Sequence, residues 1–143
     1  MHRKFIPLFI SICLLLVACS DSSTQKAREV WLESGTGEIT FGMSYPVEVT
    51  EANTGFFNGV TMAVAKINES GILGKSLKIL KMDDEGTVTT GSEVAQAFVD
   101  NPEISAVIGH WNSRVTNAVA DIYNRNEMVM ITPASTSPLL TTK

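Results

Sequence analysis

The sequence predicts an α/β domain built on a parallel β-sheet with helices on its faces. Short apolar runs alternate with longer segments of helical periodicity, and turn residues separate the two. One of the runs, ISAVIG, is continuously apolar, as is typical of a parallel strand covered on both faces. Strand and helix alternation is typical of right-handed βαβ units. The fold class follows from these observations together.

The predicted strands are the four apolar runs. They are ITFGMS, LKILKM, ISAVIG and MVMIT, which cover residues 39–44, 77–82, 104–109 and 128–132. No internal repeat or heptad interrupts this order.

Three segments between the strands carry apolar residues at helical spacing, so that each helix presents one apolar stripe to the sheet. The first covers residues 55–68, and the third begins at Ser113. The middle helix is predicted to begin with the capping box TGSE, Thr90 to Glu93, and to run to Val99. The stripes of the first and third helices are Phe57, Val60, Val64 and Ile67, and Val115, Ala118, Val119 and Ile122.

Residues 1–18 have the layout of a secretory signal, in which two basic residues precede an apolar stretch of about a dozen residues. The stretch is too short for an ordinary membrane-spanning helix. It ends in LVAC, which resembles the lipobox of bacterial lipoproteins. That resemblance implies cleavage before Cys19 and acylation of its thiol. A plain signal peptide and an uncleaved anchor remain the alternatives.

Residues 19–37 are predicted to form a polar tether, and residues 38–143 the folded domain. The role of Trp31 is left open: it either docks on the domain or belongs to the linker. Cys13 would be lost with the signal and Cys19 would carry lipid, so the mature chain has no cysteine pair for a disulfide.

The charge of the mature chain excludes a nucleic-acid partner. Removing residues 1–18 takes away Arg3 and Lys4, so nine of the 11 Lys and Arg residues remain against 15 Asp and Glu residues, a net charge of −6. Phosphate binding requires clustered positive charge.

The candidate binding site is the pair of loops HWNS and TPASTS, which follow the third and fourth predicted strands. Ligands of open parallel sheets bind outside the carboxyl ends of the strands. Asn112 or Ser113 stands where a helix begins. The residue there is either a structural N-cap or part of an anion site, because a helix N-terminus also presents free backbone N–H groups and the positive end of the dipole. Ser135 and Thr136 bring hydroxyls that can meet the same ligand. A purely structural loop is the alternative.

Enzymatic and cofactor sites are not predicted. GILGKS lacks the first glycine of a P-loop and precedes a strand. The acidic loop Asp83, Asp84 and Glu85 is interpreted as solvated rather than as a metal site. His110 is interpreted as a hydrogen-bonding scaffold residue rather than a base.

Three longer segments carry a resemblance to a known family: NGVTMAVAKINESGILGKSLKILKMDDEG, AVIGHWNSRVTNAVADIYN and MVMITPASTSPLLT. Together they resemble the Leu/Ile/Val-binding type of periplasmic substrate-binding protein of ABC transporters, over residues 38–143. The resemblance implies a two-lobed clamshell of the type I fold with a Rossmann-like sheet in each lobe, of which this chain holds part of the N-terminal lobe.

The resemblance also implies roles for single residues. Ser113 and Thr136 would hydrogen-bond the carboxylate of an amino acid. The carbonyl of Ala134 would take the ammonium, with Ser135 beside it. The segment after the first strand is longer than is usual in the family, and Tyr45 is only a guess for the contact made there.

The function implied is that of a lipid-anchored, extracytoplasmic solute-binding component of an ABC importer. Its ligand would be a branched-chain amino acid or a similar small polar molecule, and its protein partner a permease that the full-length parent would engage. No cofactor is implied. The alternatives are a ligand-sensing module of a receptor or regulator, which the same fold also serves, and a truncated remnant that binds nothing.

Overall fold

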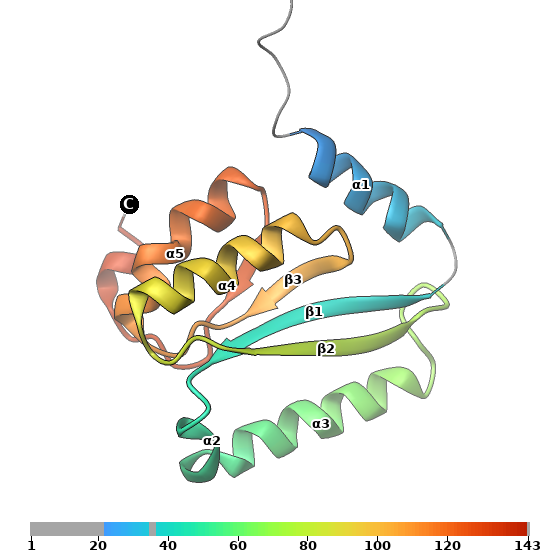
Figure 1. Ribbon diagram of the computed structural model, residues 1–143. Helices are drawn as coiled ribbons and strands as arrows, with labels where there is room; N and C mark the ends of the chain where they lie inside the picture. Colours follow the sequence, from blue (N-terminus) through green and yellow to red (C-terminus); the bar gives the residue numbers. More distant parts are fainter. Residues whose placement is uncertain (1–21, 35–36, 143) are drawn as a thin grey trace, which may run out of the picture.

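The computed structural model describes residues 22–34 and 37–142; the predicted signal and Cys19 lie outside these ranges. It confirms the predicted fold class. Four parallel strands form one sheet in the order β2-β1-β3-β4, with helices on both faces (Figure 1). The strands are β1 Glu38–Tyr45, β2 Ser76–Asp83, β3 Ile104–Ile108 and β4 Val129–Ile131, each within one residue of its predicted ends.

The helices form two layers. Helix α3 (Thr54–Asn68) lies on one face of the sheet, and α4 (Val88–Asp100) and α5 (Ser113–Arg125) lie on the other (Figure 1). Two short elements, α2 (Val49–Ala52) and the 3-10 helix η1 (Pro138–Leu140), follow β1 and β4. In the described part of the chain, no helix has the length and apolar character needed to cross a membrane.

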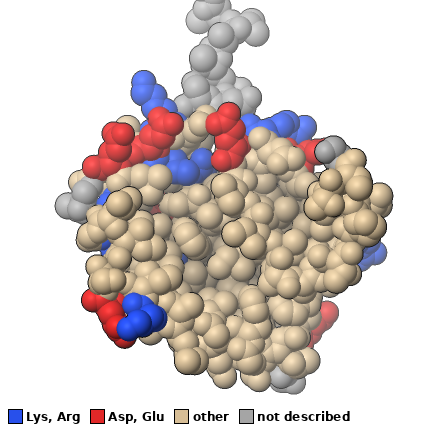
Figure 2. All heavy atoms as spheres, turned by 180° about the vertical axis from the view of Figure 1, so that it is seen from behind, with Lys and Arg blue, Asp and Glu red and all other residues tan. Residues whose placement is uncertain are grey.

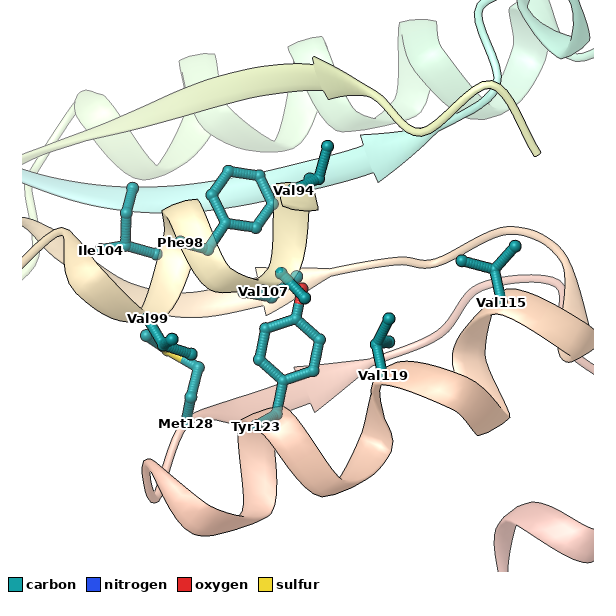
Figure 3. Packing of buried hydrophobic residues seen from close by; sticks show 10 residues of the cluster. Val94, Phe98, Val99, Ile104, Val107, Val115, Val119, Tyr123 and Met128 are labelled. Atoms are coloured by element: carbon teal, nitrogen blue, oxygen red, sulfur yellow. The ribbon is translucent and has the colours of Figure 1, made fainter. Parts of the chain in front are cut away.

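Apolar side chains fill the space between the sheet and the α4–α5 layer. In Figure 3, the rings of Phe98 from α4 and Tyr123 from α5 lie on either side of Val107, and Val99 lies beside Met128. Phe98 lies directly on the sheet at Gly42 of β1, where an added Cβ would come within 3.0 Å of the ring. A second cluster under α3 is built on Met43, Tyr45 and Phe57. The larger core cluster comprises Val94, Ala95, Phe98, Val99, Ile104, Val107, Val115, Val119, Tyr123 and Met128.

The predicted capping box at Thr90 is wrong. Helix α4 begins at Val88, and Thr87 is its N-cap, with its hydroxyl oxygen accepting the backbone N–H of Thr90 at 3.1 Å. The hydroxyl of Thr90 donates to Glu85 at 2.9 Å instead of capping a helix of its own. The threonine run places an equally good cap one turn earlier, and the helix extends to it.

The segment predicted as a polar tether, residues 19–37, is helical over Ser22–Glu33, which form helix α1. Arg28 of α1 is buried and donates from Nε to the carbonyl of Ile104 at 2.7 Å and from a guanidinium nitrogen to that of Val99 at 3.1 Å. Lys75 donates to two carbonyls near the C-terminus of α1, one of them that of Trp31. Trp31 therefore belongs to a helix that docks on the domain.

One face of the molecule is almost free of charged side chains, which gather at its rim (Figure 2). Strand β4 lies at an edge of the sheet, and Val129 and Ile131 are 60% and 65% exposed. The other side of β4 is covered, since Met130 packs against the larger core cluster. The fourth strand thus leaves apolar surface uncovered on the face away from α4 and α5.

Candidate functional site

The two loops that the sequence singles out lie together at the carboxyl ends of β3 and β4. The link between them is Ser113, whose hydroxyl oxygen accepts the backbone N–H of Thr136 at 3.0 Å and that of Ser137 at 3.3 Å. Asn112 occupies the N-cap position of α5, yet its side chain makes no capping bond. Ser113 is the first helical residue, so its hydroxyl serves the neighbouring loop rather than capping its own helix.

The hydroxyl of Ser135 turns toward the protein. Its Oγ lies 2.7 Å from the hydroxyl of Thr116 and 3.2 Å from the carbonyl oxygen of His110. Thr136 is exposed and Ala134 is half-buried. The structure therefore brings Ser113, Ser135 and Thr136 together and places Ala134 in the same loop. Their contacts with a ligand stay a prediction.

The electrostatic environment of this edge suits an anion. The N-terminus of α5 brings the positive end of the helix dipole to the two loops, and its first turn contains no acidic residue. Arg114, which follows Ser113, is exposed and lies beside the loop after β2, where its guanidinium reaches the carbonyl of Gly86 at 3.4 Å. A small carboxylate beside Ser113 would meet the favourable end of the helix dipole.

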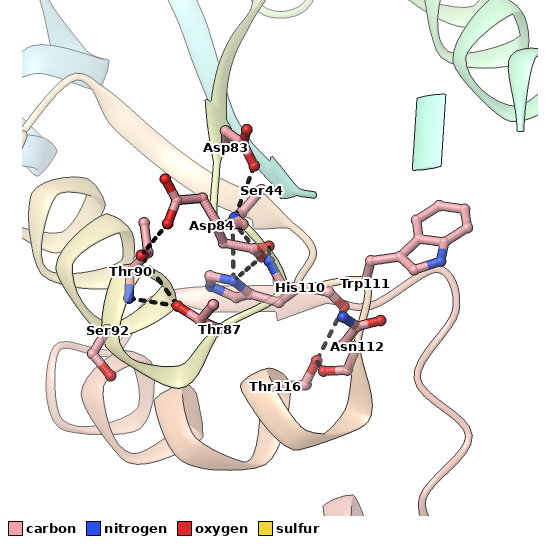
Figure 4. A network of polar contacts seen from close by, with 12 residues as sticks. Ser44, Asp83, Asp84, Thr87, Thr90, Ser92, His110, Trp111, Asn112 and Thr116 are labelled. Atoms are coloured by element: carbon pink, nitrogen blue, oxygen red, sulfur yellow. Dashed lines mark hydrogen bonds and ion pairs between the residues drawn. The ribbon is translucent and has the colours of Figure 1, made fainter. Parts of the chain in front are cut away.

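Sequence reasoning missed a buried polar cluster directly beneath the loops. His110 stands between Ser44 at the end of β1, Asp84 after β2 and Tyr123 of α5. Its Nδ1 lies 2.7 Å from Oδ2 of Asp84 and 2.9 Å from the hydroxyl of Ser44, and its Nε2 lies 2.9 Å from the hydroxyl of Tyr123. Figure 4 shows the His110 ring pointing at Ser44 and Asp84, while Trp111 turns away from the cluster. All four side chains are buried.

Burial and hydrogen bonding act in opposite directions on Asp84. Burial raises the pKa of its carboxyl, but hydrogen bonds from His110, the N–H of Gly86 and Ser44 outweigh it, and the pKa falls below the usual value. Burial, followed by the charge of Asp84, raises the pKa of the Tyr123 phenol. Asp84 is therefore a buried carboxylate held by hydrogen bonds.

The cluster is not a catalytic triad. Ser44 and Asp84 meet the same nitrogen of His110, whereas a triad needs the nucleophile and the acid on opposite nitrogens. The interpretation of His110 as a scaffold residue agrees with this geometry. The interpretation of the acidic loop as solvated is wrong for Asp84 and holds for the exposed Asp83 and Glu85. The described residues contain no group of acidic, His or Cys side chains that could hold a metal.

Four aromatic side chains border the same edge. The ring of Tyr45 lies 4.6 Å from that of Phe57, and Trp111 meets Phe56 edge-on at 5.4 Å. Tyr45, the guessed ligand contact, is 9% exposed and packs in the cluster under α3. Trp111 and Phe56 are only half-buried and form the more open part of this group.

A family model described as periplasmic binding protein matches residues 38–143. The Leu/Ile/Val-binding protein of Escherichia coli is 43% identical over 88 residues, which are 61% of this chain and 24% of that protein. The Leu/Ile/Val-binding protein homolog 2 of Brucella abortus is 33% identical over 138 residues, 94% of this chain and 34% of that protein. The chain thus spans about a quarter to a third of the length of these relatives.

Solved structures agree with the sequence relatives. An ABC transporter substrate-binding protein from Desulfitobacterium hafniense in complex with Leu gives a TM-score of 0.68 at 44% identity, over 73% of this chain and 31% of that one. A branched-chain amino acid transporter substrate-binding protein from Streptococcus pneumoniae in complex with isoleucine gives 0.64 at 25% identity, over 73% and 31%. With its parallel sheet, its paired loops and these relatives, the chain belongs to the periplasmic binding protein family.

Proposed function

We propose that this chain supplies one wall of the ligand site of a solute-binding protein that serves an ABC importer for branched-chain amino acids or similar small polar ligands. The observation that carries the proposal is the bond from the N–H of Thr136 to the hydroxyl oxygen of Ser113, because it joins the N-terminus of α5 to the loop after β4. The relatives known as Leu/Ile/Val-binding proteins and the neighbours solved with Leu or isoleucine support the ligand class.

The hydrogen bonds of Ser113 prepare its hydroxyl to meet a carboxylate. A hydroxyl has one proton and two lone pairs. Both lone pairs of Ser113 Oγ are directed at backbone N–H groups, those of Thr136 and Ser137. Among the described residues, the hydrogen bonds of this oxygen are the two that it accepts, so its own proton is left for a ligand. That proton, the exposed hydroxyl of Thr136 and the dipole of α5 form the proposed carboxylate site.

The loop after β4 would receive the ammonium group. In this proposal the carbonyl of Ala134 accepts from the ammonium, and Ser135 lies beside it. Because the Ser135 hydroxyl already contacts Thr116 and His110, it would act by holding the loop in shape. The ligand side chain would extend toward the half-buried rings of Phe56 and Trp111.

The test is an NMR titration of the ¹⁵N-labelled protein with leucine. We expect leucine to shift the amide signals of Ser113 and Thr136, and leucinamide, which lacks the carboxylate, to leave them in place. Loss of the Ser113 hydroxyl removes a hydrogen bond to a charged group, about 1.5–3 kcal/mol or roughly ten- to a hundredfold in affinity. Ser113→Ala should therefore abolish the shifts at equal leucine concentration.

The matched control is Ser92→Ala, which removes a hydroxyl from α4 that bonds only to its own helix, at the carbonyl of Val88. Its titration should equal that of the wild type. If leucine at concentrations well above the millimolar range moves no signal of the two loops in a folded wild-type sample, these loops do not form the carboxylate site and the proposal fails.

The proposed location is the extracytoplasmic side of a membrane, with a lipid anchor at Cys19. The lipobox-like LVAC segment motivates this, and several acyl chains anchor a protein stably where one does not. Metabolic labelling with palmitate tests it. We expect Cys19→Ala to lose the label and to leave the membrane fraction, and Cys13→Ala, which alters the other cysteine, to retain both. Labelling that survives Cys19→Ala would contradict the anchor.

A further inference from the structure

The side chain of His110 links the ends of two strands and one helix. Its ring reaches Ser44 at the end of β1, Asp84 after β2 and Tyr123 on α5, while its backbone continues β3. The ring has no exposed surface, and both nitrogens have partners within 2.9 Å. A ring held at both nitrogens cannot rotate without breaking buried hydrogen bonds, so the backbone of His110 has a fixed place.

The backbone carbonyl oxygen of His110 accepts hydrogen bonds from nearby hydroxyl groups. The hydroxyls of Thr132, Thr116 and Ser135 lie 2.7, 3.0 and 3.2 Å from it. A carbonyl oxygen has two lone pairs, so two of the three hydroxyls bind it fully. The hydroxyls of Thr132 and Thr116 are nearest to this carbonyl. The hydroxyl of Ser135 has a closer partner in the hydroxyl oxygen of Thr116, at 2.7 Å. One atom thereby connects α5 with the loop after β4.

The chain continues from this carbonyl to Ser113 within three residues. Thr132 lies at the start of the other loop, and its hydroxyl oxygen also accepts the N–H of Ser135 at 3.2 Å. The two loops are therefore joined twice, deep in the protein at the His110 carbonyl and near the surface at the Ser113 hydroxyl.

We propose that His110 is a positioning residue of the binding site: its buried ring fixes the end of β3, and its carbonyl fixes the loop after β4, so that Ser113 and Thr136 meet in one geometry. The role of this geometry in ligand binding rests on the proposed function. His110 itself touches no ligand in this proposal. It acts through the Thr132 and Thr116 hydroxyls and through the helix that Ser113 begins.

The test separates the carbonyl contacts from simple stability. Thr132→Val removes the hydroxyl at nearly constant size, and Thr132→Ser keeps it. We expect Thr132→Val to lower the hydrogen-exchange protection of the Thr136 and Ser137 amides at least tenfold relative to the amide of Met43 in β1, and Thr132→Ser to restore it. Tyr123→Phe, which removes the phenol oxygen from Nε2 of His110, tests the ring and should act in the same direction.

The control is Val119→Ala, which destabilises the fully buried core without touching a polar contact. It should lower protection at all three amides alike. Because the Thr132 hydroxyl also accepts the N–H of Ser135, the contribution of the His110 ring is tested by Tyr123→Phe. Unchanged relative protection in that variant would overturn the proposal, and so would losses of equal size in Thr132→Val and Thr132→Ser. The measurement needs no ligand, so it is independent of the leucine titration. If the relative protection falls while leucine moves no signal, His110 still positions the loop and the proposed function fails.

Discussion

Asp84 and His110 form a buried pair in which Oδ2 of the carboxylate lies 2.7 Å from Nδ1 of the ring, and neither side chain has exposed surface. Asp84 follows β2 and His110 follows β3, two strands that are separated in the sheet by β1, and the two residues are 26 positions apart in the chain. The hydroxyl of Ser44, from a third strand end, donates to the same carboxylate oxygen at 2.9 Å. The pair therefore stabilises the arrangement of three strand ends at once.

Replacing Asp84 by Asn should destabilise the fold by about 1.5–3 kcal/mol, because it removes hydrogen bonds to a charged acceptor. The shape of the side chain stays the same, but an NH₂ group then faces Ser44 or His110. Urea unfolding followed by circular dichroism measures the change.

Asp83→Asn is the matched control, since Asp83 is exposed and binds only backbone N–H groups that an amide oxygen also accepts. We expect a change within about 0.5 kcal/mol there. Equal effects of the two substitutions would show that burial of Asp84 does not matter.

The pH dependence follows from the lowered pKa of Asp84. A carboxyl whose pKa is lower in the folded than in the unfolded state adds stability above its unfolded pKa, about 4, and that stability is lost as the pH falls through the folded value. The free energy of unfolding of the wild type should therefore fall more steeply than that of Asp84→Asn between about pH 5 and pH 2. Parallel curves would contradict the assignment of acid sensitivity to Asp84.

Gly109 allows the backbone before His110 to lie against β1. It has φ +136°, and an added Cβ would stand 2.4 Å from the backbone oxygen of Ser44. Gly109→Ala should cost more than about 3 kcal/mol, because a backbone clash adds to the strain of a conformation that L-residues rarely adopt. Gly74→Ala is the control: it has φ +77° and nothing within 4 Å, so it should cost about 1 kcal/mol. Thermal unfolding of both variants distinguishes clash from strain.

The parts of the fold that sequence predicted well are those with a local signal. The strands end within one residue of their predicted bounds, and α5 begins at Ser113, because apolar periodicity is a property of neighbouring residues. Helix α1 has no comparable apolar stripe from which the sequence could have predicted it. It docks through the guanidinium of Arg28, which binds carbonyls 71 and 76 positions away, and such contacts leave no trace in a local pattern.

In the candidate site, too, some residues could be predicted from the sequence and others could not. The loops of Ser113 and Thr136 are predictable because parallel strands end at a common edge. The role of His110 is not, since its ring partners Ser44, Asp84 and Tyr123 are 66, 26 and 13 positions away. Asp84 sits beside two exposed acidic residues, and only the fold shows which of the three turns inward.

Docking of α1 can be tested with Arg28→Ala. The buried guanidinium makes two hydrogen bonds to the domain. Its loss should free the helix and speed cleavage by trypsin after Lys26, the trypsin site of α1 that the variant keeps, without lowering the melting temperature of the sheet to the same degree. Glu29→Ala, an exposed substitution on the same helix, is the control. Equal rates of cleavage after Lys26 in the wild type and in Arg28→Ala would show that Arg28 does not hold the helix.

The chain of 143 residues by itself should bind amino acids weakly, with a dissociation constant no better than about 1 mM, near −4 kcal/mol. Tight sites enclose most of the ligand surface and exclude water, which strengthens each charged contact. In the proposed site the loops of Ser113 and Thr136 form one open wall on which every contact would compete with solvent, and the ammonium would meet the carbonyl of Ala134 rather than a carboxylate. Titration of the lipid-free chain with leucine, isoleucine and valine by calorimetry is the measurement. Micromolar binding of any of the three would show that this wall suffices alone.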